Sequence, residues 1–342
     1  MPRFASVLAA CRPAVARRAV AFAFALGVAS FAVASEAGAA EVLRIAVSRA
    51  PVSLPLYVAQ ERGFFADEGL DVQLTDCIGG RRCLKRLLDG GADIATASEM
   101  PVVLHGFLAP DVAVIATMAN ASDNLKLIAR KASGIVRGEQ LDGRKVGVVA
   151  GTAAEYLLET HLLTVGVDPR RVTMVPIQAE DTVAALRTGR IDAVAVWEPY
   201  GYAALHGDGA DSVGVRLPLN GGYIESYNLV ASRRILGPRD AALVRLLRAV
   251  DRAEQFIQSH PADAQLVLKQ RLGLDQHFVD WVWTGLGFRL SLDQALLTTM
   301  EAETRWAQRE GHVPRGARPN MLTLLYPGPL KTFSPSAIGT GN

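Results

Sequence analysis

Two glutamates occupy matching positions in a stretch that occurs twice along the chain. Residues 91–101 read GADIATASEMP and residues 189–199 read GRIDAVAVWEP. In each copy an apolar run follows an aspartate, and a glutamate, Glu99 or Glu198, stands six residues after that aspartate. A carboxylate at the end of a buried strand needs a partner. That partner could be a positively charged ligand group, or it could be Arg49 or a backbone N–H group.

Two aromatic residues beside the second glutamate could also contact a ligand. Trp197 and Tyr200 could stack on a ring or on a cation. Packing between elements is the commoner role for either aromatic taken singly, so both interpretations stay open.

The segment from Thr152 to Glu155 reads Thr-Ala-Ala-Glu and precedes an apolar helical pattern. Thr-x-x-Glu is the signature of a capping box, in which both side chains satisfy backbone N–H groups at a helix start. Helix N-termini also bind anions. Thr152, Ala153 and Glu155 can therefore cap a helix or contact a ligand.

Two cysteines, Cys77 and Cys83, enclose a short loop. In an oxidising compartment such a pair predicts a disulfide, which contributes about 2.4 kcal/mol in the chain-entropy model. A metal or redox pair would need further ligands or the C-x-x-C spacing. Inside the loop, Gly79 and Gly80 either form a turn or let the backbone approach a ligand, and Arg81 begins a helix.

No set of residues typical of catalysis or of metal binding appears in the sequence. The chain has no G-x-S-x-G and no phosphate-binding loop. The histidines lack ligand spacing; they are His105, His161, His206, His260, His277 and His312. We therefore predict no catalytic residues, no metal and no cofactor.

The first 40 residues differ in composition from the rest. Four arginines without an acidic residue between them come first, residues 19–34 carry no charge, and small residues follow at 37–40. This pattern predicts a cleaved secretory signal peptide over residues 1–40 and a periplasmic location. Its removal takes away four arginines and one glutamate, which changes the formal net charge from +2 to −1. No nucleic-acid-binding footprint then remains.

The order of elements predicts two α/β halves of similar build. Strands alternate with helices from residue 42 onward, which favours a largely parallel sheet covered on both faces. The same order restarts at residue 145, and helices follow after residue 230. The predicted strands are residues 42–47, 70–74, 93–97, 112–119, 145–149, 172–175 and 192–196. The predicted helices include residues 81–89, 152–164, 180–188, 240–259, 262–272 and 292–309.

Open α/β sheets bind ligands beyond the carboxyl ends of their strands, and this rule selects five loops. They are residues 49–53, 76–81, 98–99, 150–155 and 197–200. The candidate ligand-binding residues are Arg49, Ser53, Gly79, Gly80, Arg81, Ser98, Glu99, Thr152, Ala153, Glu155, Trp197, Glu198 and Tyr200.

Several stretches, taken in their order and spacing, carry a family resemblance. They are LYVAQERGFF at residues 56–65, EGLDV at 68–72, GGADIA at 90–95, LDGRKVGV at 141–148 with GT at 151–152, and AALRTGRIDA at 184–193 running into WEP at 197–199. The chain resembles the periplasmic solute-binding proteins of importers for sulfonates, taurine, nitrate and thiamine precursors, the SsuA/THI5-like family. The resemblance covers about residues 42–260.

This resemblance implies a two-lobed α/β fold of the type II periplasmic binding protein kind. Each lobe would be a mixed, mostly parallel sheet flanked by helices, with extra C-terminal helices. Lobe 1 would comprise residues 41–123 and 231–342, and lobe 2 residues 124–230. The crossings between the lobes would lie near residues 124–130 and 223–231.

The resemblance also implies a function. The chain would be a monomeric, non-enzymatic substrate-binding component of an ABC importer, which closes on a small-molecule ligand by hinge motion and docks on a membrane permease. The alternative is an enzyme on the same fold, of the thiamine-pyrimidine or menaquinone-route type.

The charge of the ligand is predicted differently by the resemblance and by the residues. Sulfonate and nitrate cargo favours an anion. Four glutamates around the expected cleft would repel an anion and favour a cation or a zwitterion; they are Glu99, Glu155, Glu198 and Glu225, set against Arg49 and Arg81.

Overall fold

A computed structural model describes residues 40–207, 212–219, 223–316 and 318–339. The predicted signal peptide, residues 1–40, lies outside the described residues except for Ala40, and it stays a prediction. Among the described residues, none of the helices combines the length and the apolar character that a membrane span requires.

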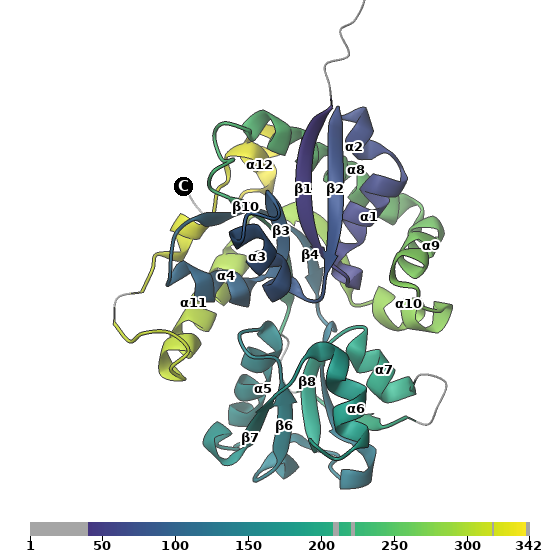
Figure 1. Cartoon of the computed structure of the whole chain (residues 1–342), viewed down its shortest axis with the longest axis vertical. Helices are drawn as coiled ribbons and strands as arrows, with labels where there is room; N and C mark the ends of the chain where they lie inside the picture. Colours follow the sequence, from purple (N-terminus) through teal and green to yellow (C-terminus); the bar gives the residue numbers. More distant parts are fainter. Residues whose placement is uncertain (1–39, 208–211, 220–222, 317, 340–342) are drawn as a thin grey trace, which may run out of the picture. The chain divides into compact units, whose positions relative to one another are not determined.

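The first sheet has six strands, in the order β11-β4-β10-β3-β1-β2 (Figure 1). They are β1 (Glu41–Ser48), β2 (Leu70–Cys77), β3 (Ile94–Ser98), β4 (Val112–Ala121), β10 (Glu225–Ser232) and β11 (Leu286–Ser291). Strand β1 pairs in parallel with β2 and β3, which are joined to it through helices. Strand β10 is antiparallel to β3 and β4, and β11 is antiparallel to β4.

The second sheet has five strands, in the order β7-β6-β8-β5-β9. They are β5 (Leu125–Arg130), β6 (Lys145–Val148), β7 (Thr173–Pro176), β8 (Ala193–Trp197) and β9 (Gly214–Arg216). Strand β6 pairs in parallel with β7 and β8, whereas β5 is antiparallel to β8 and β9. We call the part built on the first sheet lobe 1 and the part built on the second sheet lobe 2.

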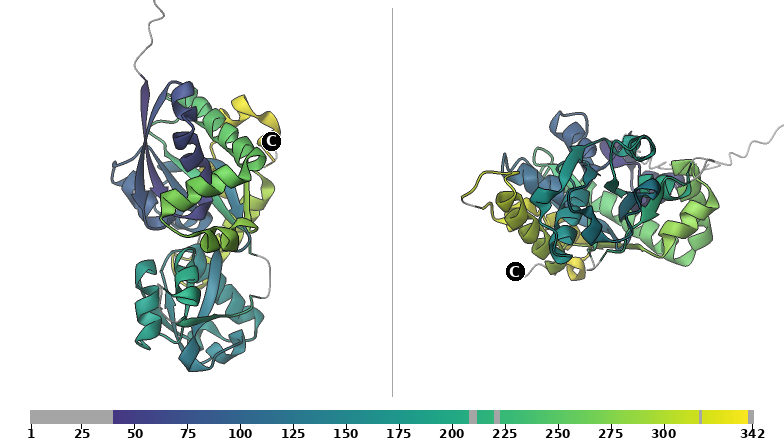
Figure 2. Two further views of the ribbon diagram at one scale, coloured as in Figure 1. Left: turned by 90° about the vertical axis from the view of Figure 1, so that its right-hand side faces the viewer. Right: turned by 90° about the horizontal axis from the view of Figure 1, so that it is seen from below.

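Helices cover both sheets, and several helices of the C-terminal half belong to lobe 1 (Figures 1 and 2). They are α1 (Leu54–Glu61), α2 (Phe64–Asp67), α3 (Gly80–Leu88), α4 (Glu99–Gly106), α5 (Ala153–Thr164), α6 (Thr182–Arg187), α7 (Tyr200–His206), α8 (Asp240–Ser259), α9 (Pro261–Leu272), α10 (Gln276–Trp283), α11 (Gln294–Arg309) and α12 (Gly328–Phe333). The longest, α8, buries a leucine-rich face against α1 and α12. The next helix, α9, begins at Pro261, where the missing N–H needs no partner.

The predicted fold class is confirmed, with two mixed sheets flanked by helices and extra C-terminal helices. The prediction that the strands of each sheet pair mostly in parallel is wrong, because both sheets contain antiparallel pairs as well as parallel ones. The expected crossings near residues 124–130 and 223–231 are largely occupied by the paired strands β5 and β10. Strand β10 is buried along its whole length between β3 and β4, so residues 225–230 lie in the first sheet. Among the described residues, the two connections between the sheets include residues 122–124, 217–219, 223 and 224.

The predicted disulfide between Cys77 and Cys83 is confirmed, with 5.5 Å between the two Cα atoms. It links the last residue of β2 to the first turn of α3. Each lobe has an apolar core of its own. Trp306 of α11 and Met100 of α4 pack into the core of lobe 2, and these contacts join the lobes within the compact unit Ala39–Asn342.

Candidate functional site

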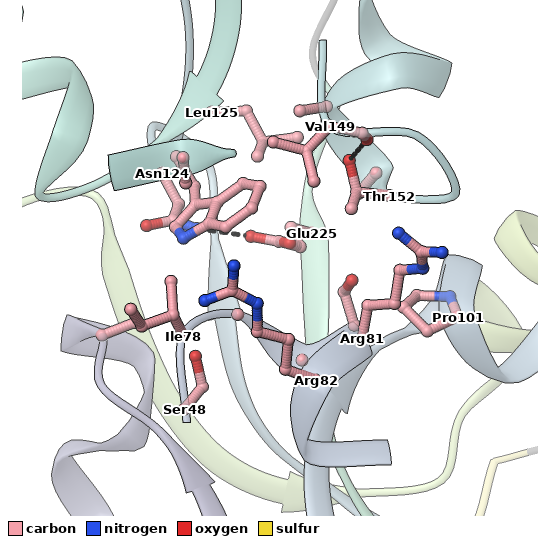
Figure 3. Close-up of a pocket in the computed structure, with 18 of the residues that line it drawn as sticks. Ser48, Ile78, Arg81, Arg82, Pro101, Asn124, Leu125, Val149, Thr152 and Glu225 are labelled. Atoms are coloured by element: carbon pink, nitrogen blue, oxygen red, sulfur yellow. Dashed lines mark hydrogen bonds between the residues drawn. The ribbon is translucent and has the colours of Figure 1, made fainter. Parts of the chain in front are cut away.

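A cavity lies between the two lobes and takes its lining from both (Figure 3). It holds about 610 Å³ of empty space, part of which is open to solvent. Lobe 1 contributes residues at the carboxyl ends of β1, β2 and β3, and lobe 2 contributes residues that follow β6, β7 and β8. This is the place where open α/β sheets bind ligands.

One wall of the cavity offers positive charge and free backbone donors. Thr152 stands at the start of α5, but its hydroxyl donates to the Val149 carbonyl at 2.7 Å and does not cap the helix. Ala153 and Ala154, in the first turn of α5, line the cavity. The N–H groups of Ala153 and Ala154 have no acceptor within their own helix, so they are available to an anion, whereas the Glu155 N–H donates to the Thr152 carbonyl at 3.1 Å.

Arg81 lies opposite this helix start. Its side chain lines the cavity and points toward Thr152 (Figure 3). A Cβ added to Gly151 would lie 3.6 Å from Arg81 Nε, so the guanidinium is close to the loop that precedes α5. Among the described residues, no hydrogen-bond acceptor or carboxylate pairs with the Arg81 side chain. The wall therefore combines an unpaired cation with the positive end of a helix dipole.

Arg82 connects the two lobes across the cavity. Its guanidinium donates to Glu180 Oε1 at 2.8 Å and to Gln178 Oε1 at 2.7 Å. Both partners follow β7 of lobe 2 and also line the cavity. The charge of Arg82 is thus paired with a carboxylate at the exposed edge of the cavity, unlike that of Arg81.

Besides Glu180, the cavity lining includes the carboxyl of Glu225, the first residue of β10. Asn124 Nδ2 donates to Glu225 Oε2 at 2.6 Å, and this bond joins the ends of the two connections between the lobes (Figure 3). Burial raises the pKa of Glu225 to about 7. The carboxyl is therefore partly protonated near neutral pH, and it can donate a hydrogen bond to a ligand as well as accept one.

An aromatic ring closes the side of the cavity next to the disulfide loop. Trp197 packs edge-on against Tyr200, with ring centroids 6.1 Å apart. A Cβ added to Gly79 would lie only 2.8 Å from Trp197 Cζ2, and the φ of Gly79 is +76°. Glycine at position 79 thus allows the loop to approach the ring and adopts a backbone conformation that other residues avoid.

The structure brings some of the predicted residues to the cavity and places the others elsewhere. Those that line the cavity are Gly79, Gly80, Arg81, Ser98, Thr152, Ala153 and Trp197. Those that do not are Arg49, Ser53, Glu99, Glu155, Glu198 and Tyr200.

Glu99 is fully buried inside lobe 1. One oxygen accepts from the Ser226 backbone N–H at 2.9 Å, and the other lies 3.5 Å from the Tyr223 hydroxyl. Burial, and after it the neighbouring Glu225 carboxylate, raises the pKa of Glu99 to about 8. Of the partners that the sequence allowed for Glu99, which were a ligand, Arg49 or a backbone N–H group, the structure provides the backbone N–H group.

Glu198 is also fully buried, with a different set of partners. Its Oε1 lies 3.3 Å from Lys126 Nζ and accepts from Trp281 Nε1 at 2.6 Å. Its Oε2 accepts from the Tyr202 backbone N–H at 2.7 Å. All of these partners belong to the protein.

The remaining predicted residues also have places outside the cavity lining. Glu155 Oε2 accepts from the Gly151 backbone N–H at 2.7 Å, so it supports the loop before α5, although Thr152 does not complete a capping box. Arg49 donates to the Leu272 carbonyl at 2.8 Å. Ser53 is buried, and Tyr200 lines a neighbouring cavity.

Several residues that line the cavity were not among the predicted ligand-binding residues, although Ala50, Ile78 and Ala154 lie in loops that the carboxyl-end rule selected. The full set is Ser48, Ala50, Ile78, Arg82, Pro101, Asn124, Leu125, Val149, Ala154, Gln178, Ala179, Glu180 and Tyr227. Gln178 and Glu180 follow the predicted strand at residues 172–175, so the carboxyl-end rule would have selected them had it been applied to that strand. Asn124 carried no local signal, because its place depends on the pairing of β5 and β10.

The electrostatic argument for a cationic ligand assumed four carboxylates around the cleft. Glu99, Glu155 and Glu198 do not line the cavity. Their carboxylates accept hydrogen bonds from backbone N–H groups of the protein instead. Only Glu225 of that set lines the cavity. The repulsion expected for an anion is therefore much smaller than the sequence indicated.

One group of possible metal ligands occurs among the described residues. Glu155, Glu159 and His312 bring ligand atoms within 4.8 Å of one another. Glu155 and Glu159 each already accept a hydrogen bond, from Gly151 N and from Trp306 Nε1. We assign no metal to this group.

Comparison with protein families identifies the chain. The profile of the family described as NMT1/THI5 like matches residues 50–264. The chain belongs to this family. It is similar to the putative binding protein YtlA of Bacillus subtilis, with 26% identity over 216 residues, 61% of this chain and 63% of that protein. It is also similar to a putative aliphatic sulfonates-binding protein of the same organism, with 24% identity over 150 residues, 43% of this chain. The chain thus spans 63% and 45% of the lengths of these two relatives.

Solved structures with this fold include a binding protein and an enzyme. The alkanesulfonate-binding protein SsuA of Xanthomonas axonopodis pv. citri, bound to MOPS, has a TM-score of 0.73 at 18% identity; the match covers 84% of this chain and 98% of that one. The desulfurization enzyme DSZB has a TM-score of 0.62 at 18% identity, over 86% and 98% of the two chains. At these identities the likeness concerns the fold alone.

Proposed function

We propose that this member of the NMT1/THI5-like family is the extracytoplasmic substrate-binding component of an ABC importer. It captures a small polar organic molecule or ion in the cavity between its lobes. The observation that carries the proposal is the cavity wall formed by Arg81 and the start of α5. This wall presents the Arg81 guanidinium and the Ala153 and Ala154 N–H groups, for which the described part of the chain provides no partner.

The ligand carries a small anionic group, held by the Arg81 guanidinium and the first-turn N–H groups of α5. Ile78, Leu125 and Trp197 supply apolar surface on the cavity lining for the rest of the molecule. Glu225, protonated in part near pH 7, tolerates the negative charge or contacts a hydrogen-bonding group. A zwitterion with its amine at Glu225 also fits, whereas a simple cation would meet the unpaired Arg81.

Export, transport and closure complete the proposal. Residues 1–40 direct the chain to the periplasm and are removed, and the mature monomer docks on a membrane permease. Arg82 joins the lobes across the cavity and stabilises the closed form. N-terminal sequencing of exported protein should find a start near Ala40 or Glu41, and an intact residue 1 would contradict export with cleavage.

The binding proposal is tested by a thermal-shift screen of sulfonates, carboxylates, nitrate, amines and pyrimidines, followed by calorimetry on the compound with the largest shift. Arg81→Ala should weaken binding at least tenfold, about 1.4 kcal/mol or more. Arg86→Ala is the matched control, because Arg86 is an exposed arginine of the same helix that does not line the cavity. If only amines bind and Arg81→Ala tightens them, the anion assignment is wrong.

We propose binding without chemistry. Among the described residues, the side chains that line the cavity include no histidine, lysine or free cysteine. The compound recovered after prolonged incubation with the protein should have an unchanged mass. A product that accumulates with time would favour the alternative, an enzyme on this fold.

A further inference from the structure

The disulfide encloses a loop that consists entirely of cavity-lining residues. Cys77 ends β2 and Cys83 lies in the first turn of α3. Every residue between them lines the cavity: Ile78, Gly79, Gly80, Arg81 and Arg82. The bond therefore joins the two ends of one continuous piece of the cavity wall.

This loop is also the part of lobe 1 that reaches residues of lobe 2 across the cavity. Gly79 lies against the Trp197 ring, and Arg82 bonds Glu180 and Gln178 at 2.8 and 2.7 Å. A shift of the loop by about one ångström would weaken these contacts, because charged hydrogen bonds depend steeply on distance and angle. The same shift would displace Arg81.

Two neighbouring positions of the loop have no room for a side chain. A Cβ added to Gly80 would lie 2.7 Å from Ala97 Cα, a backbone atom of β3, and a Cβ on Gly79 would meet Trp197. Both positions therefore require glycine, the residue with the greatest backbone freedom. Backbone bonds from Arg82 N and Cys83 N to Gly79 O are 3.2 and 3.3 Å long. The crosslink restrains the loop in addition to these two backbone bonds and to the contacts of Arg82.

We propose that the Cys77–Cys83 bond is a positioning element of the ligand cavity, which holds Arg81 and Arg82 in place for binding. This inference deepens the proposed function and rests on it only where ligand affinity is concerned. The bond acts through the two arginines and does not itself contact a ligand.

The first experiment needs no ligand. Hydrogen exchange is compared between the intact protein and the double variant Cys77→Ala, Cys83→Ala. The amides of residues 82 and 83, which donate to the Gly79 carbonyl, should exchange at least tenfold faster in the variant, while those of β3 and of lobe 2 change little. Leu268→Ala is the control, because this buried α9 residue should lower global stability without touching the loop. Unchanged exchange at residues 82 and 83, or a uniform rise throughout the chain, would overturn the proposal.

The second experiment uses ethanesulfonate as a probe of the anion wall. The double cysteine variant should bind it at least fivefold more weakly than the intact protein, whereas Leu268→Ala should bind it normally. Equal affinity in the double variant would refute the positioning role. Failure of the intact protein to bind the probe would count against the proposed anion site, and the exchange experiment would still decide the role of the disulfide.

Discussion

Glu99 and Glu198 occupy the same position in a repeated stretch, one in each lobe, yet their surroundings differ in charge. Both side chains are fully buried. Glu198 faces Lys126, a lysine that is itself fully buried, at 3.3 Å. Among the described residues, Glu99 has no such cation; its partners are a backbone N–H and the Tyr223 hydroxyl.

Other carboxylates surround Glu99 instead. Glu225 and Glu303 are buried near it, and the Tyr223 hydroxyl lies 3.2 Å from Glu303 Oε1 as well as 3.5 Å from Glu99 Oε2. Burial, and after it the charge of Glu99, raises the pKa of Glu303 well above its ordinary value. Buried carboxyl groups this close together avoid mutual repulsion by remaining protonated at neutral pH.

The difference shows what a repeated motif does and does not specify. In both lobes it ends an apolar strand with a carboxylate turned into the protein. The partner of that carboxylate comes from distant parts of the chain, β5 and α10 for Glu198, and β10 and α11 for Glu99 and its neighbours. One motif thus yields an ion pair in one lobe and a protonated cluster in the other.

Removing the buried cation should have the largest effect on stability. Lys126→Met leaves the Glu198 carboxylate buried without its counter-ion, so the free energy of unfolding should fall by about 3–5 kcal/mol, measured by urea titration. The double variant Lys126→Met, Glu198→Gln should recover a large part of this loss. A single variant as stable as the intact protein would mean that the pair is not needed to hold Glu198.

The protonated cluster should make the folded protein less stable as pH rises. The pKa of Glu99 is about 8 in the folded state and 4.5 without the fold, so the folded state binds more protons in this interval. The free energy of unfolding should therefore decrease as the pH rises from 4.5 to 8, by about 1.4 kcal/mol per pH unit for one carboxyl.

This pH dependence is measured by urea titrations between pH 5 and pH 8. Glu99→Gln should flatten the slope, since the amide does not titrate. Parallel slopes for intact protein and Glu99→Gln would contradict the protonated cluster.

Removing the hydrogen bond that Trp281 of α10 donates to Glu198 of lobe 2 should lower stability by a smaller amount. Trp281→Phe removes the indole N–H that donates to Glu198 at 2.6 Å and keeps most of the ring contact with Tyr202 and His206. Hydrogen bonds to charged groups contribute about 1.5–3 kcal/mol. Urea titration of the variant, alone and with Glu198→Gln, should show that the two losses are not additive. Strict additivity would mean that the indole acts by packing alone.

The smallest effect concerns ligand affinity. Because neither Glu99 nor Glu198 lines the cavity, each Gln variant should bind ligand within about threefold of the intact protein, less than about 0.7 kcal/mol. Calorimetry with the compound found in the screen provides the measurement. A tenfold loss of affinity in either variant would mean that the carboxylate contacts the ligand, and it would favour a cationic ligand group.

Local patterns in the sequence were sufficient for most elements and for the loops of the site. The apolar face of residues 240–259 predicted α8 with the same bounds that the structure has. A short β-rich run at residues 42–47 predicted β1, and alternation at residues 70–74 predicted β2. The carboxyl-end rule selected Arg81 and Thr152, because in a parallel sheet the ends of neighbouring strands meet at one edge. The spacing of the cysteines predicted their bond. Each of these signals lies within a few residues of its consequence.

Only the tertiary structure decided where the carboxylates point and what they meet. Glu99 and Glu198 follow strand ends and would be expected at the cleft, but their side chains turn into the protein. Glu99 bonds Ser226, and Glu198 bonds Lys126 and Trp281. Each of these partners is more than 70 residues away along the chain. Strand β10 shows the same limit, since nothing in residues 225–232 indicates insertion between β3 and β4. Hydrogen-bond satisfaction and burial depend on neighbours in space, so the sequence determined which groups needed partners and the fold determined which partners they received.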